Sequence, residues 1–299
     1  MIHHAKLNIT PGADYKPPRP GRILIPWHLH PRATRGAAIQ PSDLTPFIPP
    51  IGNQDAIGEC TGYGTKDGIS TSLTKAGHTV PGYLAALPLY RAVRCLERAA
   101  AYPSGTLPTL TDSGASPDDV FTVATRFGIQ TTAEECGETG PSDALSQYED
   151  AHVNDEPPLG EFEQDAAFKV VGAFDIVSTG DQRIEDVASA LAAGYAVGIS
   201  VYAADARFQE YVGGVMPDPP AGAGCDHWNY LAGCYLDATS APIFTAVNSW
   251  SKSWGESGLW RGGAGHLQAR STRPCVVRPR APPSPTSLRQ PARTGYCPW

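Results

Sequence analysis

Residues 247–258 read VNSWSKSWGESG, and this stretch constrains the fold more than any other part of the chain. The β-branched and aromatic run that leads into it, Ile243–Asn248, predicts a strand that ends at Asn248. Two tryptophans, Trp250 and Trp254, follow the asparagine, and glycines follow the second tryptophan. Such a pattern is too long to arise readily by chance, and it places a side-chain amide at the end of an apolar strand.

Upstream, residues 224–233 read GCDHWNYLAG. His227 stands at the entry of an apolar run, Trp228–Leu236, which predicts a second strand. A lone histidine in such a position is usually structural. It becomes a candidate base only if a nucleophile and an orienting group occur elsewhere in the chain.

Residues 54–62 read QDAIGECTG and supply a nucleophile, because a glycine-containing turn delivers Cys60 to the opening of a predicted helix. A helix N-terminus presents unpaired N–H groups and a partial positive charge, and both favour thiolate over thiol. The side-chain amide of Gln54 can reach the same place. With the backbone N–H of Cys60 it would form two donors for the oxyanion of a tetrahedral intermediate.

The three blocks follow one another in the order Gln and Cys, His, and Asn-Ser-Trp, and in this they resemble the papain family of cysteine peptidases over roughly residues 49–259. The resemblance implies that Cys60 is the nucleophile and that His227 takes its proton to form a thiolate–imidazolium pair. It also implies that Asn248 accepts from the imidazole, that Gln54 stabilises the oxyanion, and that Trp250 shields the Asn–His hydrogen bond from water.

The rest of the sequence divides into an α-rich and a β-rich half, so the expected fold class is α+β. Residues 83–101 and 117–127 have helical spacing, a polar stretch covers residues 134–164, and the later strand patterns at 168–174 and 196–202 flank a helix at 183–193. The resemblance implies two lobes, a helical lobe over about 49–165 and an antiparallel β lobe over about 166–265, with the active site in the cleft between them.

Two segments lie outside this peptidase domain of residues 49–265. Residues 1–48 are expected to be an extended, Pro-rich segment, and residues 266–299 a disordered tail rich in Pro and Arg. The abrupt loss of pattern after Gly262 is also what a shifted reading frame would produce. No long helical propeptide precedes the domain. If the N-terminal segment inhibits at all, it is expected to do so as a short strand in the cleft.

Departures from the family pattern favour a bacterial or viral type of member. Ile57 and Thr61 stand where the animal and plant enzymes have a disulfide cysteine and a tryptophan, so that disulfide cannot form. Ser251 replaces the usual glycine after Asn-Ser-Trp, a change expected to be tolerated. None of these departures touches the catalytic groups.

Composition excludes several other classes of function. The net charge is −7, and because seven arginines and no acidic residue follow Glu256, residues 1–256 carry −7 minus +7, or −14, which argues against nucleic-acid binding. No apolar run reaches the roughly 18 residues of a membrane span, and the first thirty residues do not resemble a signal peptide. A cytoplasmic location, or an undetermined one, is the resulting expectation.

Cysteine and histidine spacing gives no metal or cofactor site. The seven cysteines form no C-x-x-C pair and are expected to be mostly reduced, although a disulfide between Cys225 and Cys234 stays open. His3-His4 and His28-x-His30 lack nearby ligands and are better explained as part of a polar lead-in. No cofactor is expected.

The expected activity is hydrolysis of peptide bonds in a polypeptide substrate through a Cys-His-Asn triad and a thioester acyl-enzyme. Two alternatives stay open: an amide or isopeptide hydrolase or acyltransferase on the same scaffold, and a catalytically inactive papain-like binding protein. The sequence does not specify the natural substrate, endo- or exopeptidase action, or the oligomeric state.

Overall fold

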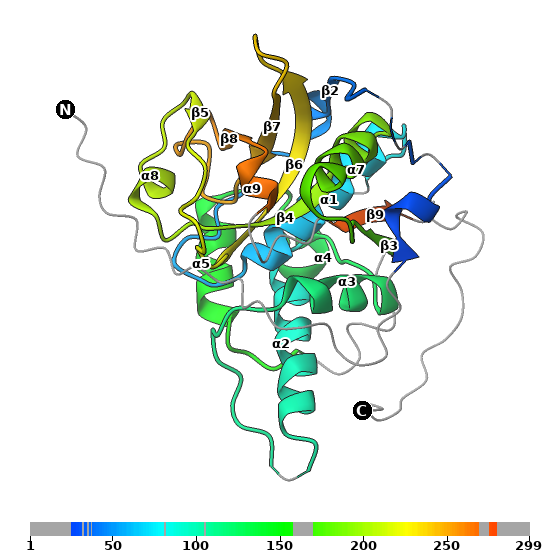
Figure 1. The fold of residues 1–299 in the computed structure, drawn as a ribbon. Coiled ribbons are helices and arrows are strands. Elements are labelled where there is room, and N and C mark those ends of the chain that lie inside the picture. Colours follow the sequence, from blue (N-terminus) through cyan, green and yellow to red (C-terminus); the bar gives the residue numbers. More distant parts are fainter. Residues whose placement is uncertain are drawn as a thin grey trace, which may run out of the picture.

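The computed structural model describes residues 25–157 apart from 32, 35, 37, 81 and 105, together with residues 170–268 and 275–279. Its first half is helical, as Figure 1 shows. The helices are α1 (Cys60–Lys75), α2 (Leu87–Ala101), α3 (Pro117–Arg126), α4 (Thr132–Cys136) and α5 (Asp143–His152). Single-turn 3-10 helices precede them at Trp27–Leu29 and Thr45–Phe47.

Local capping explains where several of these helices begin and end. The Ser116 hydroxyl accepts from the Asp118 N–H at the start of α3, and Asp118 and Asp119 occupy its first turn, where the helix dipole favours negative charge. Thr131 and Glu134 form a capping box on α4. Asp118 and Asp119 therefore stabilise the start of α3.

Among the described residues the strands, most of them from the second half of the chain, form a nine-stranded sheet. Its order is β1-β3-β9-β4-β6-β7-β8-β5, with β2 also paired to β6. The strands are β1 (Ile25–Pro26), β2 (Ser42–Asp43), β3 (Val170–Asp175), β4 (Val197–Val201), β5 (Val215–Met216), β6 (His227–Leu236), β7 (Pro242–Val247), β8 (Leu259–Gly263) and β9 (Cys275–Pro279). Helix α7 (Gly180–Ala192) and the short helices α8 (Ala206–Gln209) and α9 (Gly265–Gln268) accompany the sheet.

The β half is antiparallel except at two of its edges. β1 pairs with β3 and β5 pairs with β8 in parallel, whereas β3–β9, β4–β9, β4–β6, β6–β7, β7–β8 and β2–β6 are antiparallel. Both parallel partners are two-residue strands. The expectation of an antiparallel β lobe is therefore right for the body of the sheet and wrong for these two edge strands, which are too short to leave a period-2 pattern.

The expectation for the C-terminal tail also needs correction, because the tail contains β9, which pairs with both β3 and β4. The polar stretch of residues 134–164, for which no element was predicted, contains α5. Within residues 266–299 the expected disorder is therefore wrong for residues 275–279, where a β-branched run inserts between two existing strands. Residues 269–274 and 280–299 lie outside the described residues, as do residues 1–24 of the lead-in.

Each half has its own hydrophobic core. One gathers under α7 and the sheet around Val187, Ile199 and Leu231, and the other lies among α1, α2 and α3 around Leu73, Tyr90 and Val120. Trp228 belongs to the helical core although it lies on β6. The side chains of one strand therefore contribute to both cores, and this fixes the helical half against the sheet.

Candidate active site

A carboxylate shapes the turn that carries Cys60. The N–H of Gly58 donates to both oxygens of Asp112, at 3.0 and 3.1 Å, and the hydroxyl of Tyr90 donates to the same carboxylate at 2.5 Å. In turn the N–H of Gly114 donates to Tyr90 Oη at 2.8 Å. A Cβ on Gly58 would lie 2.9 Å from that hydroxyl, so only glycine fits this approach. Asp112 thus fixes the backbone two residues before the nucleophile.

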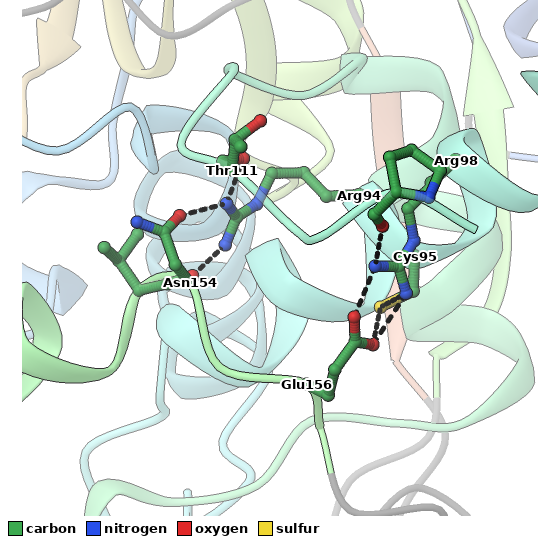
Figure 2. A network of polar contacts seen from close by, with 8 residues as sticks. Arg94, Cys95, Arg98, Thr111, Asn154 and Glu156 are labelled. Carbon is green, nitrogen blue, oxygen red and sulfur yellow. Dashed lines mark hydrogen bonds and ion pairs between the residues drawn. The ribbon is translucent and has the colours of Figure 1, made fainter. Parts of the chain in front are cut away.

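Arginines on α2 hold the long segment that contains Asp112 (Figure 2). Arg94 donates to the carbonyl oxygens of Thr111 and Val153, and Arg98 donates to the carbonyl of Pro108 at 2.8 Å while pairing with Glu156. Since these bonds join α2 both to the segment before α3 and to the residues after α5, they hold the support of the Cys60 turn in place.

Cys60 is the first residue of α1 and is completely buried. The helix packs along β6 through two glycines: a Cβ on Gly64 would lie 2.7 Å from the Trp228 ring, and one on Gly68 would lie 3.5 Å from Tyr230 Cβ. One helical turn and two strand residues both advance by about 6 Å. One turn earlier on α1, Cys60 is therefore expected at the level of Asp226, directly beside His227 at the start of β6.

Gln54 ties the Cys60 turn to the end of β7. Its backbone N–H donates to the Ser249 carbonyl at 2.9 Å, and its side-chain oxygen accepts from the Ser249 hydroxyl at 2.5 Å. Its amide nitrogen donates to the Ile57 carbonyl at 2.8 Å, which uses one of its two hydrogens. The second amide hydrogen is thus left for another acceptor.

His227 and Asn248 form the expected pair. His227 Nε2 lies 2.7 Å from Asn248 Oδ1, and both side chains are buried. The Trp250 ring lies over the imidazole with its centroid 4.8 Å away, and Phe208 lies edge-on at 6.1 Å. Trp250 therefore covers the hydrogen-bonded pair as the resemblance implied.

The surroundings of His227 are apolar and keep it neutral. Burial lowers the pKa of His227 to about 4, and the hydrogen bond with Asn248 opposes this effect only in part. Among the described residues, Nδ1 of the ring makes no hydrogen bond. The imidazole is consequently ready to accept a proton at Nδ1, and it would hold that proton only beside a negative charge.

A group of buried ionisable residues, the Glu59 cluster, lies behind the nucleophile. It comprises Glu59, Tyr63, Lys66, Asp67, Tyr83 and Glu149. Burial and the charge of Glu149 raise the pKa of Glu59 well above its usual value, and burial raises the pKa of Glu149 to about 7. Lys66 lies 2.6 Å from Asp67 and 3.7 Å from the centre of the Tyr83 ring.

Several expectations from the sequence can now be assessed. Ser251 has a positive φ of 64°, which explains why glycine is usual there, and its N–H donates to the Gly52 carbonyl at 2.9 Å. Cys225 and Cys234 form no disulfide with each other. Among the described residues no group of three His, Cys, Asp or Glu side chains could hold a metal ion, and no helix is long and apolar enough to cross a membrane.

The described part of the lead-in does not lie on Cys60. Residues Ser42 and Asp43 pair with Cys234 and Gly233, near the opposite end of β6 from His227, and Thr34 donates to Ser189 on α7. The hypothesis that the N-terminal segment enters the cleft as a strand is therefore wrong for this part. Residues 1–24 lie outside the described residues.

Sequence reasoning missed three residues that support the site. These are Asp112, which fixes the Cys60 turn, Asn229, which donates to Asn248, and Trp260, which donates to Asn229. Asn229 was visible as a polar residue in an otherwise apolar strand, but a single sequence gives no signal of its partner 31 residues away.

Comparison with known proteins identifies the family and the fold. A family model described as papain family cysteine protease matches residues 45–272. Among curated protein sequences no significant match was found. Solved structures with the same fold include xylellain, a cysteine protease from Xylella fastidiosa, with 19% identity, a TM-score of 0.60, and coverage of 91% of this chain and 96% of xylellain.

Two eukaryotic structures are similar in fold as well. The procathepsin L2 proteinase from Tenebrio molitor larval midgut is 18% identical, with a TM-score of 0.63 and coverage of 90% of this chain and 78% of that one. Bromelain from Ananas comosus is 15% identical, with a TM-score of 0.53 and coverage of 80% and 98%. With the family model spanning most of its length, this chain belongs to the papain family of cysteine proteases.

Proposed function

We propose that this protein hydrolyses peptide bonds with Cys60 as nucleophile, His227 as general base and acid, Asn248 as the residue that orients His227, and Gln54 as an oxyanion donor. The observation that carries the proposal is the hydrogen bond of 2.7 Å between His227 Nε2 and Asn248 Oδ1. It uses one ring nitrogen and leaves Nδ1 for the thiol, which the register of α1 on β6 supports.

The proton balance of the site fits this assignment. A buried imidazole with a pKa near 4 is neutral at neutral pH and accepts the thiol proton at Nδ1. The resulting thiolate raises the affinity of His227 for that proton, because opposite charges a few ångströms apart stabilise each other strongly in an apolar site. The helix N-terminus of α1 favours the same thiolate.

Catalysis then follows in two acyl-transfer steps. The Cys60 thiolate attacks the peptide carbonyl, and the oxyanion accepts hydrogen bonds from the Cys60 N–H and from the second amide hydrogen of Gln54. His227 gives its proton to the leaving amine, and a thioester remains on Cys60. Water deprotonated by His227 cleaves the thioester and restores the pair. Being a protease, the protein acts on polypeptide substrates.

The test is labelling with an epoxysuccinyl thiol-protease probe, read by mass spectrometry on the wild type and on Cys60→Ala, His227→Ala and Cys95→Ala. We expect one adduct on Cys60 in the wild type, none in Cys60→Ala, and labelling slowed by orders of magnitude in His227→Ala. Cys95→Ala is the matched control, because burial raises the pKa of Cys95 to about 11 and makes it a poor nucleophile. A folded wild-type protein that takes no label, or takes it at another cysteine, would overturn the proposal.

A further inference from the structure

Asn229 is a buried amide whose hydrogen bonds converge on the candidate triad. It lies two residues after His227 on β6 and is 1% exposed. Its Nδ2 donates to Asn248 Oδ1 at 3.0 Å and to the Trp228 carbonyl at 3.0 Å, and its Oδ1 accepts from Trp260 Nε1 at 2.8 Å. Both amide hydrogens and the amide oxygen therefore have partners, which is what a buried amide requires to be stable in a strand.

The direction of these bonds is fixed by Trp260. An indole N–H can only donate, so the atom of Asn229 that faces it must be the oxygen. The amide nitrogen then faces Asn248, and because it too is a donor, the atom that it meets must be Asn248 Oδ1. The backbone N–H of Ser249 donates to the same oxygen at 2.9 Å. Asn248 is thereby held with its oxygen, and not its nitrogen, towards His227.

The orientation of Asn248 in turn fixes the tautomer of His227. An acceptor opposite Nε2 requires a proton on Nε2, so Nδ1 is the nitrogen that exchanges a proton with the thiol. If Asn248 were reversed, its NH₂ group would face Nε2, and the imidazole would have to place its proton on Nδ1. That state cannot accept the thiol proton and gives no hydrogen bond to an imidazolium.

We propose that Asn229, oriented by the indole N–H of Trp260, is a positioning residue that keeps Asn248 Oδ1 towards His227 and so selects the reactive tautomer of the base. This inference rests on the proposed function of His227 and Asn248. It assigns a role in positioning the base to two further residues, Asn229 on β6 and Trp260 on β8. The Ser249 N–H remains when either residue is changed, so the loss on substitution is partial.

The test uses Trp260→Phe and Asn229→Val. The first keeps an aromatic ring and removes the donor that orients Asn229 together with part of the ring volume, and the second removes the whole link with a residue suited to a strand. We expect kcat/KM to fall about threefold to tenfold for Trp260→Phe and about tenfold to thirtyfold for Asn229→Val, the loss of one or two ordinary hydrogen bonds, with KM nearly unchanged. Rates are expressed per active site titrated with the epoxysuccinyl probe.

The pH profile separates positioning from damage to the fold. A less stable imidazolium makes the thiol harder to ionise, so the apparent pKa of the acid limb of the kcat/KM profile should rise. It also makes the imidazolium easier to deprotonate, so the apparent pKa of the basic limb should fall. Each limb should move by about half a pH unit or more. Loss of folded protein lowers the height of the profile without moving either limb. The carboxylate of Asp226, which precedes His227 in the chain, accepts from the N–H groups of Ala203 and Ala204 and stays unchanged in every variant.

Trp27→Phe is the matched control for the loss of a buried indole. Trp27 is as buried as Trp260, and among the described residues its Nε1 has no hydrogen-bond partner. It should have the wild-type profile. If Trp260→Phe and Asn229→Val are as active as the wild type, or lose activity with unmoved limbs, the positioning role is wrong while the triad stands. A wild type that neither labels nor turns over substrate instead refutes the triad itself.

Discussion

The two sides of the candidate site are built from different kinds of groups. On the β6 side the groups are neutral: His227 contacts Asn248, Trp250 and Phe208, and behind Asn248 lie Asn229 and Trp260. On the α1 side, Cys60 is followed within two turns by Tyr63, Lys66 and Asp67 and preceded by Glu59, which lies beside Glu149. Both sides are buried to a similar degree, so burial alone does not account for the difference.

This difference predicts which side governs the rate and which side governs the dependence of stability on pH. In the neutral side, the charge that His227 meets is the thiolate, so its protonation reports the state of Cys60. In the Glu59 cluster, by contrast, burial raises the pKa values of three carboxyl groups, those of Glu59, Asp67 and Glu149. We therefore expect substitutions on the neutral side to change the rate, and substitutions in the Glu59 cluster to change stability and its dependence on pH.

The largest expected effect is that of Asn248→Ala on the rate. Without the acceptor, His227 loses its orientation and tautomer, and kcat should fall by about two to four orders of magnitude. Steady-state kinetics on an unstructured peptide substrate measure this, with exposed Asn154→Ala as the control. A loss of kcat below about fivefold would show that the neutral side does not govern the rate.

The next effect belongs to the other side, where Lys66→Met leaves Asp67 buried without its ion pair at 2.6 Å. Breaking a buried pair by removing one partner destabilises a protein by about 3–5 kcal/mol. Urea unfolding should show a loss of this size, and the double variant Lys66→Met/Asp67→Asn should recover part of it because no uncompensated charge remains. The rate per folded molecule should change little. A large fall in kcat with normal stability would break the proposed division between the two sides.

These two sides also differ in how far the sequence predicts them. Cys60, His227, Asn248 and Gln54 stand in local blocks whose spacing carries the chemistry, and α2 and α3 have regular apolar spacing. Helix α5 escaped prediction because its buried face includes Glu149, a residue that reads as solvent-exposed. Strand β9 escaped because its pairing with β3 and β4 depends on residues far away in the chain. Asn229 and Lys66 escaped because a buried polar residue is meaningful only once its partner is placed.

A smaller effect, with a distinct pH dependence, is expected for Glu149→Gln. Burial raises the pKa of Glu149 from about 4.5 to about 7, so between these values the folded state binds more protons than the unfolded state. The wild type is therefore most stable below pH 4.5 with respect to this group, and it loses that stability as the pH rises through 7. Glutamine removes the buried charge and still accepts from Tyr63, whose hydroxyl lies 2.8 Å from Glu149.

The variant should thus match the wild type near pH 4.5 and exceed it by about 1–3 kcal/mol at pH 8. Unfolding free energies at the two pH values measure the difference, and Glu210→Gln, at an exposed carboxyl, is the control. An equal gain at both pH values would mean that the stability difference does not come from burying the negative charge of Glu149.

The smallest effect concerns the contact between α1 and β6, and it compares two glycines of α1, Gly64 and Gly68. An added Cβ at Gly64 would lie 2.7 Å from Trp228, so Gly64→Ala must push the helix away from β6, and about 1 kcal/mol or somewhat more should be lost. At Gly68 the nearest atom is 3.5 Å away, an ordinary contact, so Gly68→Ala should gain up to about 1 kcal/mol from helix propensity. Because Gly64 lies one turn from Cys60, its variant should also slow probe labelling beyond its loss of stability, whereas Gly68→Ala should label at the wild-type rate. Equal labelling rates in the two variants would contradict the register of α1 on β6 that sets Cys60 beside His227.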